Sequence, residues 1–289
     1  MSARDASAPM PAVSAVPVPA PGLDATFAAS SVPVPAADYD QLVEWAKRLE
    51  REAPLFRRVF AEAGVSRLID VGAGSARHAI MFAEWGIAVD AVDPDESMLA
   101  QAEVNAAEAA DRIAAAGGRL RLHRAAFGGL AALGLEPADA LICTGNALPH
   151  VGGREGLRTA LADFACVVRP GGAVILHLLN HERLLAEQVR VIPPVVRETS
   201  EGTKVFLRIM DYPDGGKSID FDFVTLVRDH AGSWTVSDRR SLHTALPANI
   251  LAEELEAVGF SGIELLGGHD GSALGVTDES VILVARRSS

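Results

Sequence analysis

The sequence predicts an α/β fold, a doubly wound and mostly parallel seven-stranded sheet with an antiparallel β insert. Two observations predict this class. Between residues 67 and 179, short apolar runs alternate with helical patterns or, once, with a longer loop, which is the order expected of a parallel sheet with right-handed crossovers. After about residue 200 the pattern changes to strands separated by turns, and a last helix and two strands complete the main sheet.

Each element follows from a local pattern. Leu42, Trp45, Leu49, Phe56 and Val59 recur at helical spacing and predict one or two amphipathic helices before the first strand. Glycine, proline and polar residues bound the elements that follow. The expected strands of the main sheet are 67–71, 88–92, 120–123, 139–144 and 173–179, with 262–266 and 280–285 near the end of the chain. The expected helices are 79–85, 97–116, 154–168 and 247–258.

The insert has expected strands at 204–211, 218–228 and 234–244. In the second of them Ile219, Phe221 and Phe223 alternate with Asp220 and Asp222, so one face is apolar and the other acidic. The acidic face is either solvated surface or a site that attracts a cationic amine.

Four segments follow from these patterns. Residues 1–36 are rich in Ala and Pro and are expected to be a disordered tail, because proline removes backbone donors and Phe27 is the one aromatic residue there. Residues 37–200 form the main domain, residues 201–246 the antiparallel insert, and residues 247–289 the helix and strands that complete the main sheet.

Composition and charge limit the function classes. The 289 residues are 49% hydrophobic and 22% charged, which is typical of a soluble globular protein. The net charge of −12 disfavours nucleic acid and an anionic membrane as partners and favours a small or cationic ligand. Cys143 and Cys166 are too few for a disulfide framework, and neither a signal peptide nor a spanning apolar run is recognisable. We therefore expect a cytoplasmic protein.

The first strand leads into Asp70-Val-Gly72-Ala-Gly74-Ser-Ala76. Its glycines permit a tight turn that leaves the N–H groups at the start of the next helix free for anionic atoms, although a plain strand-to-helix turn has the same composition. A dinucleotide-binding fingerprint needs Gly or Ala at position 77, which is Arg77. The pattern of an acid followed by alternating small residues therefore favours S-adenosylmethionine over NAD, and an NAD oxidoreductase is a third alternative.

A second carboxylate ends the second strand. Asp93 follows the run 88–92 and is expected beside the glycine loop, where it can accept hydrogen bonds from both ribose hydroxyls. Capping of the next helix, together with Pro94 and Asp95, is an alternative role that is compatible with the first.

Three stretches resemble class I S-adenosylmethionine-dependent methyltransferases: LIDVGAGSARHAIMFAEWGIAVDAVDPDESMLAQA, ICTGNALPHV and VVRPGGAVIL. The resemblance spans residues 39–287, and the segment 143–150 is most similar to glycine N-methyltransferases and their small-molecule relatives. It implies a Rossmann-like fold and S-adenosylmethionine as cofactor, and we expect the antiparallel insert to cover the active site. The cofactor-binding residues that it implies are Arg48, Asp70, Gly72, Ala73, Gly74, Asp93, Met98, Ala126, Phe127 and Thr144. It also implies that Asn146 and His150 face the transferring methyl group and the acceptor.

One position departs from the glycine enzymes, which follow the fifth strand with an arginine that clamps the substrate carboxylate. This chain has Leu179 there. Without a charge-assisted contact worth roughly 1.5 to 3 kcal/mol, glycine is a poor acceptor. Arg183 or Arg208 could substitute for the missing arginine.

The mechanism expected for a small-molecule acceptor rests on positioning, because a sulfonium donor already carries an activated leaving group. N-methylation is slightly favoured, since an amine needs no catalytic base. In the alternative, an O-methyltransferase, His150 or His243 would be the base, and His243 qualifies only if the insert covers the site. His177 is interpreted as a satisfied core residue and His181 as a cap.

Two further expectations concern partners. No metal-ligand spacing is recognisable, so no metal is expected. A cofactor-binding sensor or scaffold without transfer is the non-enzyme alternative, and both a monomer and a homodimer fit the sequence.

Overall fold

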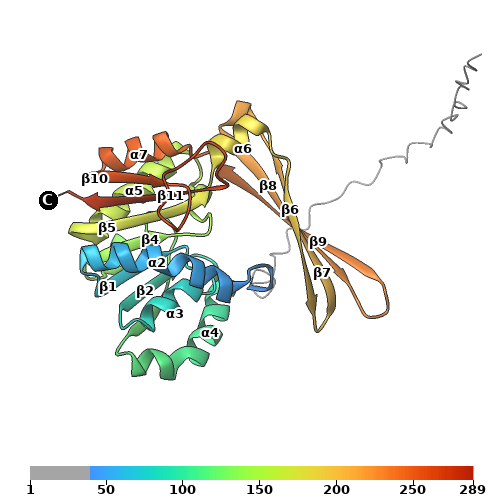
Figure 1. The fold of residues 1–289 in the computed structure, drawn as a ribbon, viewed down its shortest axis with the longest axis horizontal. Coiled ribbons are helices and arrows are strands. Elements are labelled where there is room, and N and C mark those ends of the chain that lie inside the picture. The colour runs from blue at the N-terminus through green and yellow to red at the C-terminus, as the bar shows by residue number, and fades with distance from the viewer. Residues whose placement is uncertain (1–39, 289) are drawn as a thin grey trace, which may run out of the picture. The chain divides into compact units, whose positions relative to one another are not determined.

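The computed structural model describes residues 40–288, and a seven-stranded sheet organises this part of the chain (Figure 1). The strand order is β10-β11-β5-β4-β1-β2-β3. Strands β1 to β5 pair in parallel, whereas β11 runs antiparallel to both β5 and β10. The strands are β1 (Arg67–Val71), β2 (Ala88–Asp93), β3 (Arg119–Arg124), β4 (Ala138–Cys143), β5 (Val168–Leu179), β10 (Phe260–Leu266) and β11 (Ser280–Arg287). The predicted doubly wound, mostly parallel sheet is confirmed.

Helices cover both faces of this sheet. Three of them bury apolar residues against one face: α2 (Trp45–Ala63), α3 (Arg77–Ala83) and α4 (Glu96–Ala115). Two cover the other face: α5 (Arg154–Val167) and α7 (Ala248–Ala257). Strand β1 contributes to both cores, since Leu68 packs in the first and Ile69 in the second. A strand covered on both faces needs apolar side chains at successive positions, which explains the uninterrupted apolar runs in the sequence.

A second sheet consists of four antiparallel strands in the order β6-β7-β8-β9. They are β6 (Val191–Thr199), β7 (Gly202–Asp211), β8 (Ser218–Arg228) and β9 (Trp234–Thr244). The antiparallel insert therefore begins at Val191 and not at residue 201. The sequence does not predict β6, because Pro193 and Pro194 interrupt it and shift its register against β7. Proline lacks the N–H that a ladder needs, and an edge strand such as β6 tolerates that loss.

Short helical segments connect these elements: α6 (His181–Glu187), and the 3-10 turns η1 (Ala131–Leu133), η2 (Leu148–Val151) and η3 (Asp214–Gly216). The expected tail at residues 1–36 lies outside the described residues. Across residues 40–288, no helix has both the length and the apolar character needed to cross a membrane.

The direction in which successive strands are added reverses between β1 and β4, and the loops that follow these two strands are in close contact. Gly72, after β1, has φ +71°, and a Cβ there would stand 2.5 Å from the Cβ of Ala147, after β4. Glycine is required at this position because any side chain would collide with the neighbouring loop. Such a reversal is where open α/β sheets bind their ligands.

Candidate functional site

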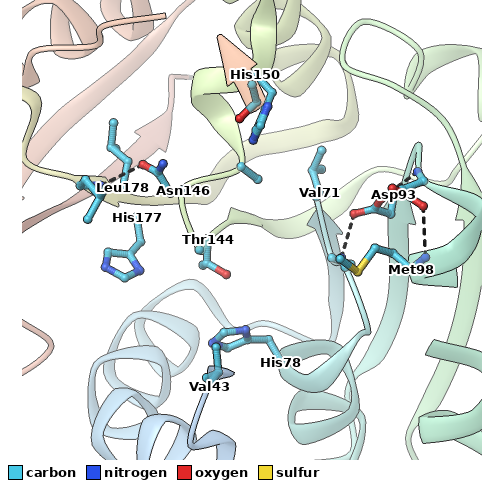
Figure 2. A pocket seen from close by; sticks show the side chains of 18 of the residues that line it. Val43, Val71, His78, Asp93, Met98, Thr144, Asn146, His150, His177 and Leu178 are labelled. Atoms are coloured by element: carbon cyan, nitrogen blue, oxygen red, sulfur yellow. Dashed lines mark hydrogen bonds between the residues drawn. The ribbon is translucent and has the colours of Figure 1, made fainter. Parts of the chain in front are cut away.

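A cavity of about 590 Å³ lies at the carboxyl ends of β1, β2 and β4 (Figure 2). In the view of Figure 2, Asp93 and Met98 lie at one end, and His177 and Leu178 at the other. The four-stranded sheet completes the lining with Arg208, Phe221, Phe223, Arg239, Ser241 and His243. The insert therefore contributes to the cavity, as the sequence predicts.

The glycine loop after β1 is held by strand β2. The backbone N–H groups of Gly72 and Ala73 donate to the Val92 carbonyl at 2.8 and 3.1 Å, and Gly74 N–H donates to Asp93 Oδ2 at 2.8 Å. These three N–H groups of the loop are therefore not free for an anionic ligand. The loop contributes its shape to the cavity, since Gly72, Ala73 and Gly74 all line it.

Asp93 links the loop to the start of helix α4. It is 7% exposed, and its Oδ1 accepts from Asp95 N–H at 2.9 Å. Asp95 caps the helix by accepting from Ser97 N–H at 2.8 Å and Met98 N–H at 3.3 Å. Burial raises the pKa of Asp93 above the usual value. Asp93 thus has a structural role and also lines the cavity, where it can accept further hydrogen bonds.

The cavity brings together most of the predicted cofactor-binding residues. Eight of the ten line it: Arg48, Gly72, Ala73, Gly74, Asp93, Met98, Phe127 and Thr144. Ala126 is exposed and outside the lining, where Ala125 stands instead. Asp70 is buried beneath the loop, and its burial, aided by the charge of Asp93, raises its pKa to about 7. A direct contact with a ligand is therefore not supported for Ala126 or Asp70.

The three predicted catalytic residues form one cluster. Asn146 Nδ2 lies 3.5 Å from His243 Nδ1, and the rings of His150 and His243 have centroids 4.4 Å apart. His243 Nε2 lies 3.0 Å from Ser241 Oγ, and the ring of Phe221 stacks on His243 at 4.9 Å and 13°. If Asn146 donates to Nδ1, the proton of the neutral imidazole is on Nε2 and points to Ser241. This network fixes the plane of the His243 ring.

The cluster is electrically neutral. Burial, followed by the charge of His150, lowers the pKa of His243 to about 3. Burial, with a smaller contribution from the Arg239 guanidinium, also lowers the pKa of His150. Both imidazoles are therefore uncharged near neutral pH.

Strand alternation decides which face of the insert lines the cavity. Phe221 and Phe223 line the cavity, whereas Asp220 and Asp222 do not. Asp220 Oδ1 instead accepts a hydrogen bond from Arg240 Nε at 2.7 Å. The interpretation of these carboxylates as an attraction for a cationic amine is wrong. Of the two arginines suggested by the sequence, Arg208 lines the cavity, and Arg183 pairs with Glu187 at 3.1 Å.

Some lining residues are not indicated by the sequence. Arg239 and Phe223 belong to strands whose alternation is visible, but alternation alone does not say which face turns toward the cavity. Glu52 lines the cavity from α2, and no local pattern distinguishes it from a surface residue of that helix.

Comparison with known proteins agrees with this geometry. Residues 68–172 match a family model described as a methyltransferase domain. A glycine/sarcosine N-methyltransferase of Parasynechococcus marenigrum (strain WH8102) is 32% identical over 148 residues, which are 51% of this chain and 50% of that protein. The rat (Rattus norvegicus) glycine N-methyltransferase is 29% identical over 133 residues, which are 43% of each chain. The chain thus spans about half the length of the curated relatives it matches.

Solved structures share the fold over nearly the whole chain. The sugar N-methyltransferase KedS8 from Streptoalloteichus sp ATCC 53650 superposes with a TM-score of 0.67 at 20% identity, covering 97% of this chain and 100% of that chain. The CcbJ methyltransferase from Streptomyces caelestis gives 0.70 at 19% identity, covering 88% and 96%. The methyltransferase-domain match over residues 68–172 and the glycine/sarcosine N-methyltransferase relatives support a class I S-adenosylmethionine-dependent methyltransferase related to the glycine N-methyltransferases, and the solved structures share its Rossmann-like fold.

Proposed function

We propose that the protein transfers the methyl group of S-adenosylmethionine to an amine nitrogen of a small molecule that also carries oxygen atoms. The observation that carries this proposal is the division of one cavity into two unlike ends. Residues that suit the donor line one end, and a neutral cluster of Asn146, His150 and His243 lines the other.

The donor end suits an adenosyl group. Asp93 offers carboxylate oxygens at the position expected for ribose hydroxyls, and the side chains of Met98 and Phe127 offer apolar contact for an adenine ring. Arg48 also lines the cavity and carries the positive charge that a methionine carboxylate needs. S-adenosylmethionine supplies the activated methyl group, and these side chains would hold its sulfonium in place.

The acceptor end favours nitrogen. The neutral imidazole of His150 can accept a hydrogen bond from an amine N–H and so turn the nitrogen lone pair toward the methyl group, and the ring of His243 packs against it. With a pKa of about 3, His243 is too weak a base to take a proton from a phenol or an alcohol near neutral pH. An unprotonated amine does not need such a base, and in-line alignment is then the main source of rate acceleration.

The remaining lining supports an acceptor with oxygen substituents. Arg208 and Arg239 present guanidinium groups, which suit hydroxyl or carboxylate oxygens. Leu179 lines the cavity at the position where the glycine enzymes carry their arginine clamp, so an acceptor larger than glycine is favoured. The relatives named glycine/sarcosine and sugar N-methyltransferases also act on amines that carry oxygen.

Mass spectrometry with a trideuteromethyl donor tests the proposal. The protein would be incubated with amino acids and amino sugars, and in parallel with the matching hydroxy acids and neutral sugars. We expect a labelled N-methyl product only from the amines. Labelled products only from hydroxyl compounds would establish O-methylation instead, and donor binding without product across the panel would establish a sensor.

A matched pair of variants tests the acceptor cluster. His243→Gln is expected to lower kcat/KM for the amine by at least about tenfold and to leave the affinity for S-adenosylhomocysteine unchanged. His230→Gln is the control, because His230 is an exposed residue between β8 and β9. Equal activities of the two variants would contradict the assignment of His243.

A further inference from the structure

A second cluster of potential ligand groups lies at the edge of the cavity. Glu52 belongs to helix α2, His177 to strand β5, and His269 to the loop between β10 and β11. One oxygen or nitrogen of each lies within 4.8 Å of the others. Glu52 Oε2 is 3.8 Å from His269 Nε2, and the rings of His177 and His269 meet edge-on with centroids 4.9 Å apart.

The two imidazoles have nitrogen atoms that the surrounding protein does not satisfy. His177 Nδ1 and His269 Nε2 are buried, and no group among residues 40–288 forms a hydrogen bond with either atom. The interpretation of His177 as a satisfied core residue is therefore wrong. A buried polar atom without a partner costs about 1 to 3 kcal/mol, so a ligand that engages these nitrogens would be favoured.

Hydrogen bonds from neighbouring residues orient the carboxylate. Glu52 is fully buried, and its Oε1 accepts from Arg48 Nε at 2.8 Å. Its Oε2 accepts from His78 Nε2 at 2.7 Å and keeps a second lone pair on the side of His269. Such outer contacts fix the orientation of a ligating group and are a regular feature of metal sites.

We propose that Glu52, His177 and His269 bind a divalent transition-metal ion, for which Zn²⁺ is the natural probe. Two imidazoles and one carboxylate are a common donor set for zinc and other first-row transition metals, whereas Mg²⁺ and Ca²⁺ prefer oxygen ligands alone. With metal–ligand bonds of about 2.1 Å, neighbouring ligand atoms of a tetrahedral site lie roughly 3.4 Å apart. A small side-chain movement would shorten the distance between Glu52 Oε2 and His269 Nε2 from 3.8 Å to that value.

The position of the cluster leaves one side of the ion accessible. Glu52 and His177 line the cavity, and His269 lies outside its lining. A fourth ligand would therefore approach from the cavity, where a lone pair of a bound small molecule can complete the coordination shell. The proposal does not depend on the identity of the methyl acceptor.

Cobalt(II) spectroscopy tests the site directly. The full chain, without an affinity tag and treated with EDTA, would be titrated with Co²⁺ while its visible absorption is recorded. We expect one ion per chain, a d–d band typical of nitrogen and oxygen ligands, and displacement by one equivalent of Zn²⁺. Absence of a band, or binding of Mg²⁺ with equal affinity, would overturn the proposal.

Variants locate the ion. His177→Gln and His269→Gln are each expected to weaken Co²⁺ binding at least about tenfold, because loss of a direct ligand should cost no less than loss of an outer contact. His123→Gln is the matched control, since His123 pairs with Asp90 at 2.8 Å without a second imidazole. Equal weakening in the control, or none in the two ligand variants, would overturn the assignment.

A third measurement covers the case in which the ligand variants do not fold. Zn²⁺ should raise the thermal midpoint of the unmodified protein, Mg²⁺ should not, and EDTA should reverse the shift. An unchanged midpoint with saturating Zn²⁺ would overturn the proposal without any variant.

Discussion

Replacing Asp93 with alanine is expected to weaken binding of the methyl donor at least about tenfold. The carboxylate accepts from Gly74 N–H at 2.8 Å and from Asp95 N–H at 2.9 Å, and it lines the cavity at the end assigned to the donor. The substitution therefore removes both the proposed ribose contact and the group that holds the glycine loop to β2.

The magnitude follows from the contacts. A hydrogen bond to a charged group contributes about 1.5 to 3 kcal/mol, so loss of one such bond to a ribose hydroxyl corresponds to roughly a 10- to 150-fold higher dissociation constant. Burial already raises the pKa of Asp93, which means that the charged form is costly before a ligand binds. A ligand that donates hydrogen bonds relieves that cost, so we expect the upper part of the range.

Isothermal titration with S-adenosylhomocysteine measures the effect without turnover. Asp93→Asn keeps an acceptor for Gly74 N–H and removes the charge, so it separates the ribose contact from the loop contact. Asp90→Asn is the control, because Asp90 lies on the same strand, pairs with His123 at 2.8 Å and does not line the cavity. An unchanged dissociation constant for a folded Asp93→Ala protein would refute the donor site.

Three further predictions concern stability and acceptor binding. Gly72→Ala should lower the free energy of unfolding by about 2 to 4 kcal/mol, because φ is +71° and the new Cβ would collide with Ala147. Gly134→Ala is the control, since Gly134 has φ +63° and a Cβ there would meet nothing within 4 Å, so this substitution should cost less. Urea unfolding of the two variants compares these costs. Burial lowers the pKa of His181 to about 4, so the unfolded state binds more protons below about pH 6.5. Stability should therefore fall with decreasing pH by up to about 1.4 kcal/mol per unit, and urea titrations of His181→Gln should show a shallower dependence. Phe221→Ala should raise KM for the acceptor several-fold and leave S-adenosylhomocysteine binding unchanged, since the Phe221 ring stacks on the His243 ring at 4.9 Å. Val236→Ala is the kinetic control, because Val236 is an exposed residue of the same sheet.

The parts of the fold that follow from sequence are those with a strong period. Strands β1, β8 and β9 begin and end where their alternation or apolar run predicts. Helix α6 has seven residues, too few for a helical period to emerge, and β6 contains two consecutive prolines that only its edge position tolerates. The sequence analysis misses α6 and β6 because a short stretch of sequence does not reveal the tertiary position of either element.

The same distinction applies to the site. Gly72 and Asp93 are predictable because a loop and a strand end encode their roles within a few residues. Ala126 is misplaced because a loop has no period that fixes which side chain turns inward, and the neighbouring Ala125 and Phe127 line the cavity instead. Glu52 and His269 approach each other only through packing of α2 against the loop after β10, and their separation along the chain conceals the contact.

The four-stranded sheet contributes to only one of the two proposed ends of the cavity, and this separates two kinds of evolutionary change. Side chains of β7, β8 and β9 line the proposed acceptor end together with Asn146 and His150, while the loops after β1 and β2 line the proposed donor end. Substitutions at positions such as Phe223 or Arg239 can therefore change the substrate preference without changing the residues proposed to bind the methyl donor. Related proteins could diverge in substrate preference in this way while they continue to bind the same methyl donor.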